Sequence, residues 1–272
     1  RDIVSLYRQY NAALYAQIGS GITIMEFSIE TLLIISVLFF AAALLYSSVG
    51  HGGGSAYLAV MALFGFAPDT MKTTALSLNI IVSFIATIKY YRASHFSWRL
   101  FWPFALTSIP LAFIGGWLRL PGGVYRTLVG CILLFASYQF FKPVSKTANE
   151  DYKQPNIAVC LSIGSGIGLL SGLTGVGGGI FLSPLLVFLR GADFRTISGI
   201  AAPFILVNSI SGLLGHWAKV KTLPESIVLF GIAVVIGGLI GSELGSRRLS
   251  TPALRKLLGL VLAIAGLKFI LS

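Results

Sequence analysis

Apolar residues fill long, uninterrupted stretches of this chain, and short polar connections separate them. Most stretches approach the roughly 20 residues that a helix needs to cross the hydrocarbon core of a bilayer. Their apolar positions are continuous rather than alternating, so the pattern predicts helices and not the strands of an outer-membrane barrel. We expect helical elements at residues 30–46, 54–66, 71–90, 99–118, 123–141, 156–173, 178–190, 196–218, 223–244 and 252–271.

Composition supports an all-α polytopic membrane protein. The 272 residues are 56% hydrophobic and 11% charged, whereas soluble domains carry about 25% charged residues. This balance excludes soluble enzymes, nucleic-acid-binding proteins and secreted disulfide scaffolds. The formal net charge is +11, but Lys and Arg lie mainly in the short connections, where membrane topology and lipid headgroups account for them. The lipid bilayer is therefore an expected partner, and nucleic acid is not.

The chain contains an internal repeat. Residues 44–58 (LLYSSVGHGGGSAYL) align without a gap on residues 169–183 (LLSGLTGVGGGIFLS), with two leucines and four glycines identical. The most polar stretch lies between the two copies. We therefore predict an N-terminal interfacial segment at 1–26, transmembrane repeat 1 at 27–141, a connecting loop at 142–155 and transmembrane repeat 2 at 156–271.

Each repeat contains five elements, of which the second is short. Five crossings, or three crossings and a re-entrant hairpin, are both odd numbers, so either arrangement turns the second repeat upside down relative to the first. A single broken helix in each repeat would instead give parallel repeats. We expect inverted repeats, as in many secondary transporters, with glycine-rich broken or re-entrant helices meeting near the midplane.

Two glycine clusters occupy the matched breaks, Gly50-His51-Gly52-Gly53-Gly54 and Gly175-Val176-Gly177-Gly178-Gly179. Adjacent glycines disfavour a helix interior, and a helix that restarts after them presents free N–H groups and the positive end of its dipole. A ligand can approach these amides closely because no side chain intervenes. Two such helix ends would form an anion site without Lys or Arg. No Gly-Lys-Ser/Thr follows either cluster, so a phosphate loop is excluded.

The candidate substrate-binding residues lie in these clusters, beside them, or at matched polar positions of the third elements. They are Gly50, His51, Gly52, Gly53, Gly54, Ser48, Asn79, Thr174, Gly175, Gly177, Gly178, Gly179 and Asn208. The two asparagines line the site or bond neighbouring helices. The two hydroxyls reach the site or bond back to their own helix. The histidine either takes up a proton and couples its movement to the anion, or stays neutral beside the break.

Other glycines recur every four residues at Gly164, Gly168 and Gly172, and at Gly237, Gly241 and Gly245. This spacing predicts close helix contacts rather than a binding site. The sequence contains no sensibly spaced Ser-His-Asp set, no His-Glu-x-x-His motif and no cluster of metal ligands. We therefore expect no catalysis, no cofactor and no metal.

The two halves with a glycine-rich break near the start of each, including LTGVGGG at residues 173–179, resemble the TauE/SafE sulfite exporter family, also called toluene sulfonate uptake permeases. The resemblance covers the chain from about residue 30. It implies transport of small sulfur-containing anions, such as sulfite, thiosulfate, sulfoacetate or other organosulfonates, across a bacterial-type cytoplasmic membrane. The first cluster departs from the second by carrying His51 in place of a valine.

We expect a secondary transporter that works by alternating access. Export is favoured because an inside-negative potential drives an anion outward by about 2.3 kcal/mol per charge per 100 mV, whereas import would need a proton or another co-ion. The alternative is a passive anion channel or facilitator that uses the same glycine-lined site. More of the Lys and Arg fall on one side of the predicted spans, which places that side in the cytoplasm and both termini outside. The oligomeric state stays open.

Overall fold

The computed structural model describes residues 27–141, 155–189, 191–217, 226–247 and 252–271. The chain divides into two units, Arg1–Leu32 and Leu33–Ser272. The predicted interfacial segment at 1–26, and all of the predicted loop except its last residue, lie outside the described residues.

The described residues form ten helices and contain no strand. The helices are α2 (Ile29–Ser47), α3 (Gly54–Leu63), α4 (Pro68–Arg92), α5 (Trp98–Trp117), α6 (Gly122–Phe141), α7 (Ile157–Thr174), α8 (Gly179–Phe188), α9 (Phe194–Trp217), α10 (Ile227–Arg247) and α11 (Pro252–Leu271). Each overlaps one predicted element, so the all-α prediction is confirmed.

Local chemistry explains several helix ends. Helix α4 begins at Pro68. Proline has no backbone N–H, but an N–H in the first turn of a helix has no intrahelical acceptor, so no hydrogen bond is lost there. Asn156 caps α7 by accepting a hydrogen bond from the N–H of Ala158 at 2.8 Å. Helices α3 and α8 each contain only 10 residues, or about 15 Å of rise. Neither therefore crosses a hydrocarbon core of about 30 Å alone.

Six helices in the described part of the chain are long and apolar enough to cross a membrane. They are Ile29–Ser47, Pro68–Arg92, Trp98–Trp117, Ile157–Thr174, Phe194–Trp217 and Ile227–Ser246. Many of their apolar side chains are exposed, as expected where lipid rather than water surrounds the helices. The protein is therefore a multi-pass membrane protein.

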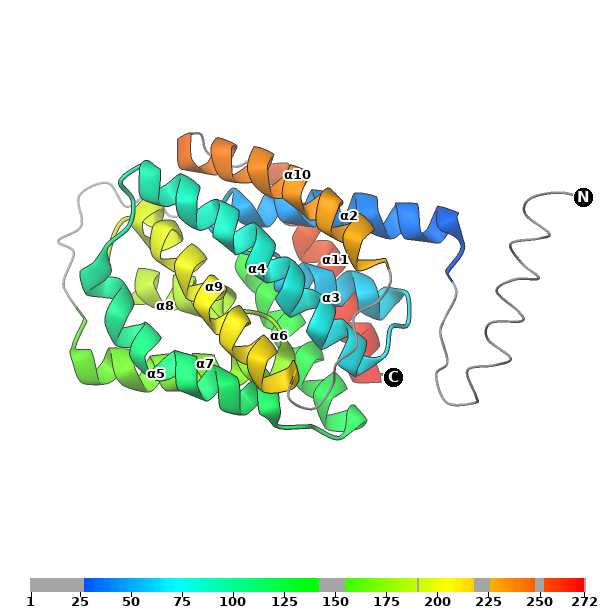
Figure 1. The fold of residues 1–272 in the computed structure, drawn as a ribbon, viewed down its shortest axis with the longest axis horizontal. Coiled ribbons are helices and arrows are strands. Elements are labelled where there is room, and N and C mark those ends of the chain that lie inside the picture. The colour runs from blue at the N-terminus through cyan, green and yellow to red at the C-terminus, as the bar shows by residue number, and fades with distance from the viewer. Residues whose placement is uncertain (1–26, 142–154, 190, 218–225, 248–251, 272) are drawn as a thin grey trace, which may run out of the picture. The chain divides into compact units, whose positions relative to one another are not determined.

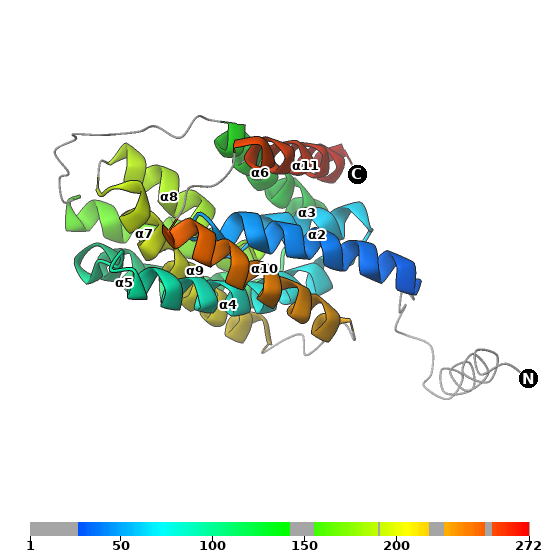
Figure 2. The same ribbon diagram turned by 90° about the horizontal axis from the view of Figure 1, so that it is seen from above.

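Within residues 33–271, most of the helix packing joins the two halves of the sequence. Helix α5 packs on α7 and α9, α4 packs on α9 and α10, and α6 packs on α11. Figure 1 shows α4 and α9 side by side, and Figure 2 shows α6 and α11 together on another side. The short helices α3 and α8 lie between these groups: α3 contacts α4 and α11, while α8 packs on α9 and on Phe135 of α6.

The glycine stripes make close backbone contacts, as their spacing predicts. A Cβ atom on Gly164, Gly168 or Gly172 of α7 would collide with the carbonyl oxygens of Phe104, Ser108 and Ala112 on α5, respectively. The stripe on α10 packs equally closely on residues of the first half. Cβ atoms on Gly237, Gly241 and Gly245 would collide with the carbonyl oxygens of Phe40, Leu44 and Ser48, respectively. Each stripe thus fastens one half of the sequence to the other.

A buried apolar cluster supports the second break. It joins α5, α7, α8 and α9 through large side chains such as Phe104, Ile167, Leu182 and Phe204. Burying each such side chain contributes about 1.5–3 kcal/mol in water; in a membrane, close packing supplies the attraction instead. This cluster fixes the position of α8, the helix that starts at the end of the second glycine cluster.

Candidate functional site

Both helix breaks occur at the glycine clusters. Helix α2 ends at Ser47 and α3 starts at Gly54, while α7 ends at Thr174 and α8 starts at Gly179. Gly50, Gly53, Gly175, Gly177 and Gly178 have φ of 73°, 102°, 85°, 87° and 85°. Side chains strain this left-handed backbone, which explains why glycines concentrate here.

The two clusters meet at Asn79, which projects from α4. Its Nδ2 donates to the carbonyl oxygen of Val176 in the second cluster at 3.2 Å. A Cβ atom on Gly52 would lie 2.5 Å from Asn79 Oδ1, and one on Gly54 would overlap the same amide. A Cβ on Gly177 would lie 2.8 Å from Nδ2. The absence of side chains therefore lets both clusters touch one asparagine.

His51 makes a second link between the clusters. Its Nδ1 lies 2.9 Å from the carbonyl oxygen of Val49, and its Nε2 lies 3.1 Å from both the carbonyl oxygen of Gly179 and the hydroxyl of Ser183. A neutral imidazole donates from only one nitrogen, while an imidazolium donates from both. The neutral ring can donate to Val49 and accept from Ser183, and the charged ring can donate to Val49 and Gly179.

Two helix N-termini lie at this junction. Gly53 and Gly178 are the N-cap residues of α3 and α8, and neither has a side chain that could cap the first turn. The first N–H groups of each helix have no intrahelical acceptor and carry the positive end of the helix dipole. This arrangement favours a negatively charged group.

Several buried polar atoms in the described residues lack a hydrogen-bond partner. Asn79 Oδ1 and Ser209 Oγ are two of them, and both residues have no exposed surface. Ser209 Oγ lies 3.2 Å from the position of a Cβ on Gly177, so it faces the second cluster. Buried polar atoms are normally paired, and a bound ligand or water would satisfy these two.

Comparison with known proteins identifies the family of this chain. The family model described as "Sulfite exporter TauE/SafE" matches residues 34–269. The chain belongs to the TauE/SafE family. A relative named as a probable membrane transporter protein in Sinorhizobium fredii is 38% identical over 87% of this chain and 97% of its own length.

More distant relatives carry the same description. One from Methanocaldococcus jannaschii is 23% identical over 91% of this chain and its full length, and one from Bacillus subtilis is 25% identical over 81% of this chain and 92% of its own. Both are also named as probable membrane transporter proteins. No solved structure matches the chain. This TauE/SafE protein is therefore similar to probable membrane transporters along most of its length.

Other predicted site residues of the TauE/SafE chain make local contacts instead. The hydroxyl of Ser48 donates to Leu45 O and that of Thr174 to Leu170 O, each at 2.7 Å within its own helix segment. Gly50 packs against the backbone of Ser198 at the start of α9. These positions shape the ends of the breaks rather than their junction.

Asn208 differs from its sequence counterpart. It is fully buried on α9, and its Nδ2 donates to Phe204 O in the same helix at 2.8 Å. Its Oδ1 has no partner among the described residues. The matched sequence positions of the two asparagines therefore do not give matched hydrogen bonds, because only Asn79 reaches across to the opposite cluster.

Three further residues belong to the junction. Ile205 of α9 packs against Gly52, Gly177 and Gly179, the hydroxyl of Tyr57 donates to Gly52 O at 2.9 Å, and Ser183 contacts His51. Ile205 and Ser209 are four residues apart on one helix face, which is the only sequence signal that links them.

Two titratable residues near a helix end are more buried than the sequence suggests. The exposed fractions of Lys72 and His216 are 4% and 2%. Lys72 packs beside Gly175, where a Cβ would lie 3.2 Å from its Cα. Tertiary packing therefore covers both side chains, although both residues lie near the ends of their helices.

Proposed function

We propose that this protein is a secondary carrier of small sulfur-containing anions, which bind between the two glycine clusters and cross the cytoplasmic membrane by alternating access. One observation carries the proposal: two glycine-capped helix N-termini converge on a buried junction where polar atoms lack partners. Membership of the TauE/SafE family supports the transport role, and the name of the family supports sulfite as a substrate class.

The junction also suggests the hydrogen-bonding character of its ligand. Backbone N–H groups donate and so favour anionic oxygens, whereas Asn79 Oδ1 can only accept and needs a donor. Hydrogen sulfite carries both kinds of group, and a fully deprotonated anion would need a water to reach the amide oxygen. No side chain of lysine or arginine is required, so release is not opposed by a fixed ion pair.

We infer that the two repeats are inverted. Each contains five helices, and the contacts between halves come in matching pairs: α5 with α7 corresponds to α10 with α2, and α5 with α9 corresponds to α10 with α4. An inverted arrangement brings the two short helices to the midplane from opposite sides. The binding site then lies where neither membrane face has permanent access.

His51 is the candidate for coupling to protons. The two hydrogen-bond arrangements open to its ring would exchange Ser183 for Gly179 as partner of Nε2. Since Gly179 starts α8, protonation would alter the hydrogen bonding of the second break directly. Such coupling would serve import, while export down the membrane potential needs no co-ion.

The direct test is flux into proteoliposomes that contain the purified protein, with sulfite, thiosulfate, sulfoacetate, taurine, sulfate and acetate as the panel. We expect saturable flux of sulfite or sulfonate anions only. Gly53→Val should abolish it, because Gly53 has φ of 102° and its Cβ would lie 2.6 Å from the Tyr57 ring. Gly166→Val is the control, since nothing lies near that position. Absence of flux for every anion would refute the proposal.

A channel would use the same site without alternation. Counterflow separates the two: vesicles preloaded with unlabelled substrate should accelerate entry of labelled substrate through a carrier. An open pore would show no such stimulation and no saturation. That result would refute the carrier mechanism and support the channel mechanism.

A further inference from the structure

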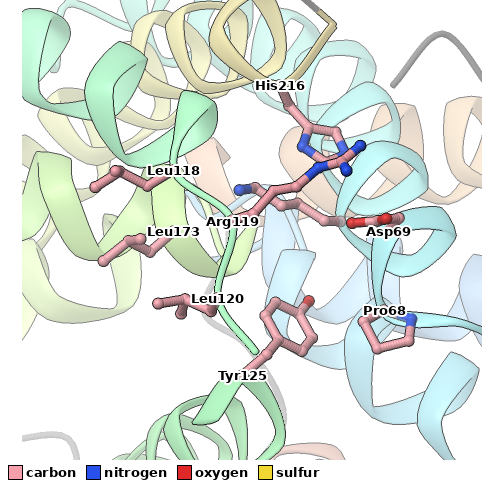
Figure 3. Close-up of a pocket in the computed structure, with 9 residues that line it drawn as sticks. Pro68, Asp69, Leu118, Arg119, Leu120, Tyr125, Leu173 and His216 are labelled. Atoms are coloured by element: carbon pink, nitrogen blue, oxygen red, sulfur yellow. The ribbon is translucent and has the colours of Figure 1, made fainter. Parts of the chain in front are cut away.

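A second polar cluster lies outside the glycine junction, beside Thr174 and Gly175 at the start of the second break. A cavity of about 20 Å³ opens there between α4, the α5–α6 connection and the ends of α7 and α9. Its polar lining residues are Asp69, Lys72, Arg119, Tyr125 and His216. Figure 3 shows Asp69, Arg119, Tyr125 and His216 around one space.

Lys72 brings a buried charge to this cavity. Its Nζ donates to the carbonyl oxygens of Gly115 and Gly116 at 3.3 and 3.2 Å. An ammonium group has three N–H donors, so one remains for a further acceptor. Among the described residues, no carboxylate lies within ion-pair distance of Lys72. Asp69 lies in the same cavity but forms no ion pair with Lys72. A buried charge without a directly paired opposite charge is costly, and an anion would compensate it.

His216 supplies a second donor. Its exposed fraction is 2%, and its Nε2 has no hydrogen-bond partner in the part of the chain that the structure describes. Figure 3 places its ring beside Arg119 at the edge of the cavity. Since buried ring nitrogens normally have partners, this nitrogen is available to a ligand.

The charge and the volume of the cavity determine which ligands it can hold. Two basic side chains, Lys72 and Arg119, and one carboxylate, Asp69, line the cavity, so it favours an anion over a cation. Its volume of about 20 Å³ exceeds the ~10–15 Å³ that a single water needs. One halide ion, or one oxygen of a larger anion, therefore fits. The rest of a larger anion can extend past Arg119, which is exposed.

We propose that this cavity binds a small anion, one atom of which accepts hydrogen bonds from Lys72 Nζ and from His216 Nε2. The cavity adjoins the second glycine cluster, because Lys72 packs on Gly175 and the hydroxyl of Tyr125 donates to Thr174 O at 3.1 Å. If the proposed transport function holds, on which this further role rests, the cavity is a waiting site for the anion beside its central site.

The test is thermal unfolding of the purified full chain in detergent, with gluconate as the bulky background anion. The protein carries Asn79→Leu, so that binding at the glycine junction does not contribute. Sodium bromide and sodium thiosulfate are titrated separately. A ligand that binds the folded state raises Tm in a saturable way. We expect such a rise, and we expect Lys72→Met to weaken the apparent affinity by about tenfold or more, because the anion loses a charge-assisted hydrogen bond.

Lys268→Met is the matched control. Lys268 also donates to two helix-end carbonyls, those of Ala62 and Leu63 at 3.2 and 2.9 Å, but it does not line the cavity. We expect the anion response to survive this change. An equal loss in both lysine variants would overturn the proposal, since it would reflect net charge alone.

Further variants keep the proposal testable if Lys72→Met fails to fold. Arg119→Gln changes an exposed side chain and His216→Gln removes the free ring nitrogen; each should weaken the response. If neither variant changes the anion response, the proposed site is overturned. A response to bromide and thiosulfate alike indicates a general anion site, and a response to thiosulfate alone indicates a site for the sulfur anion. Stabilisation by neither overturns the proposal.

Flux measurements on the protein with native Asn79 separate this proposal from the transport function. Lys72-dependent stabilisation without flux of any sulfur anion would refute the function and leave the cavity site standing. Saturable flux, with equal anion stabilisation in Lys72→Met and the native residue, would refute the cavity site and leave the function standing.

Discussion

Asn79 is the residue on which both glycine clusters converge. Positions 52 and 54 of the first cluster and 177 of the second all lie so near its amide that a methyl group would collide with it. Its Nδ2 is used in the bond to Val176, while its Oδ1 has no partner in the described structure. This half-satisfied amide is costly in an empty site, so a bound ligand gains from completing it.

Asn79→Leu should therefore abolish saturable transport with little loss of stability. The substitution removes a hydrogen bond and an unsatisfied acceptor together, and the two effects on folding oppose each other. Flux and thermal unfolding of the same preparation check both parts. Asn208→Leu should reduce flux less, because that side chain bonds within its own helix. Equal losses would show that the two asparagines act alike.

His51→Gln tests the proton-coupling hypothesis. Lower pH favours the imidazolium, which can donate to Val49 and Gly179 together; glutamine cannot change its charge. We expect transport by the unchanged protein to vary between pH 5.5 and 7.5, roughly the range in which histidine titrates, and the variant to lose this variation. Identical pH profiles would remove His51 from the coupling mechanism.

At the scale of the helix, glycine serves two separable purposes. Inside α7 and α10 it permits close contact of backbones, and at the starts of α3 and α8 it permits left-handed turns. Spacing distinguishes the two in the sequence: intervals of four indicate a packed helix face, and adjacent glycines indicate a break.

Gly168 and Gly166 provide a matched pair within one helix. A Cβ on Gly168 would overlap the backbone of Ser108, whereas nothing lies near that of Gly166. Gly168→Ala should destabilise the protein by about 1–3 kcal/mol through overpacking, and Gly166→Ala should stabilise it by up to about 1 kcal/mol through helix propensity. Thermal unfolding in detergent measures both. A fall in Tm for both variants would argue against the packing role.

The sequence predicts the helices and the breaks well, because both depend on local patterns. It does not predict the contacts between Asn79 and Val176 or between His51 and Ser183, since these join residues about 100 or more positions apart. The burial of Lys72 likewise follows from carbonyls on another helix. Ile205 lies in an apolar run and carries no sign of its place between the clusters. The periodicity of apolar residues describes one helix at a time, whereas residues from several helices form the site.

For the whole molecule, the important feature is that the tightest helix contacts join the two halves. Helices α5 and α7 come from different halves, as do α6 and α11. A moving unit built from one sequence repeat alone would have to break these contacts. In an alternating-access cycle, the rigid bodies should instead combine helices from both halves.

Expression of residues 1–148 and 149–272 as two separate chains tests this interdependence. The division falls in the predicted connecting loop. We expect the two chains to copurify and to regain saturable flux only when they are produced together. A first half that unfolds cooperatively on its own, with a Tm like that of the complete chain, would contradict the expectation.

The stripe contacts also set an order of events during synthesis. The carbonyl faces of α5 and of the end of α2 are covered by glycines of α7 and α10, which the ribosome makes later. The nascent first half must therefore remain in the membrane with these faces uncovered until its counterpart arrives. Slow elongation through the second half would prolong that exposure, and membrane quality control would then compete with completion of the fold.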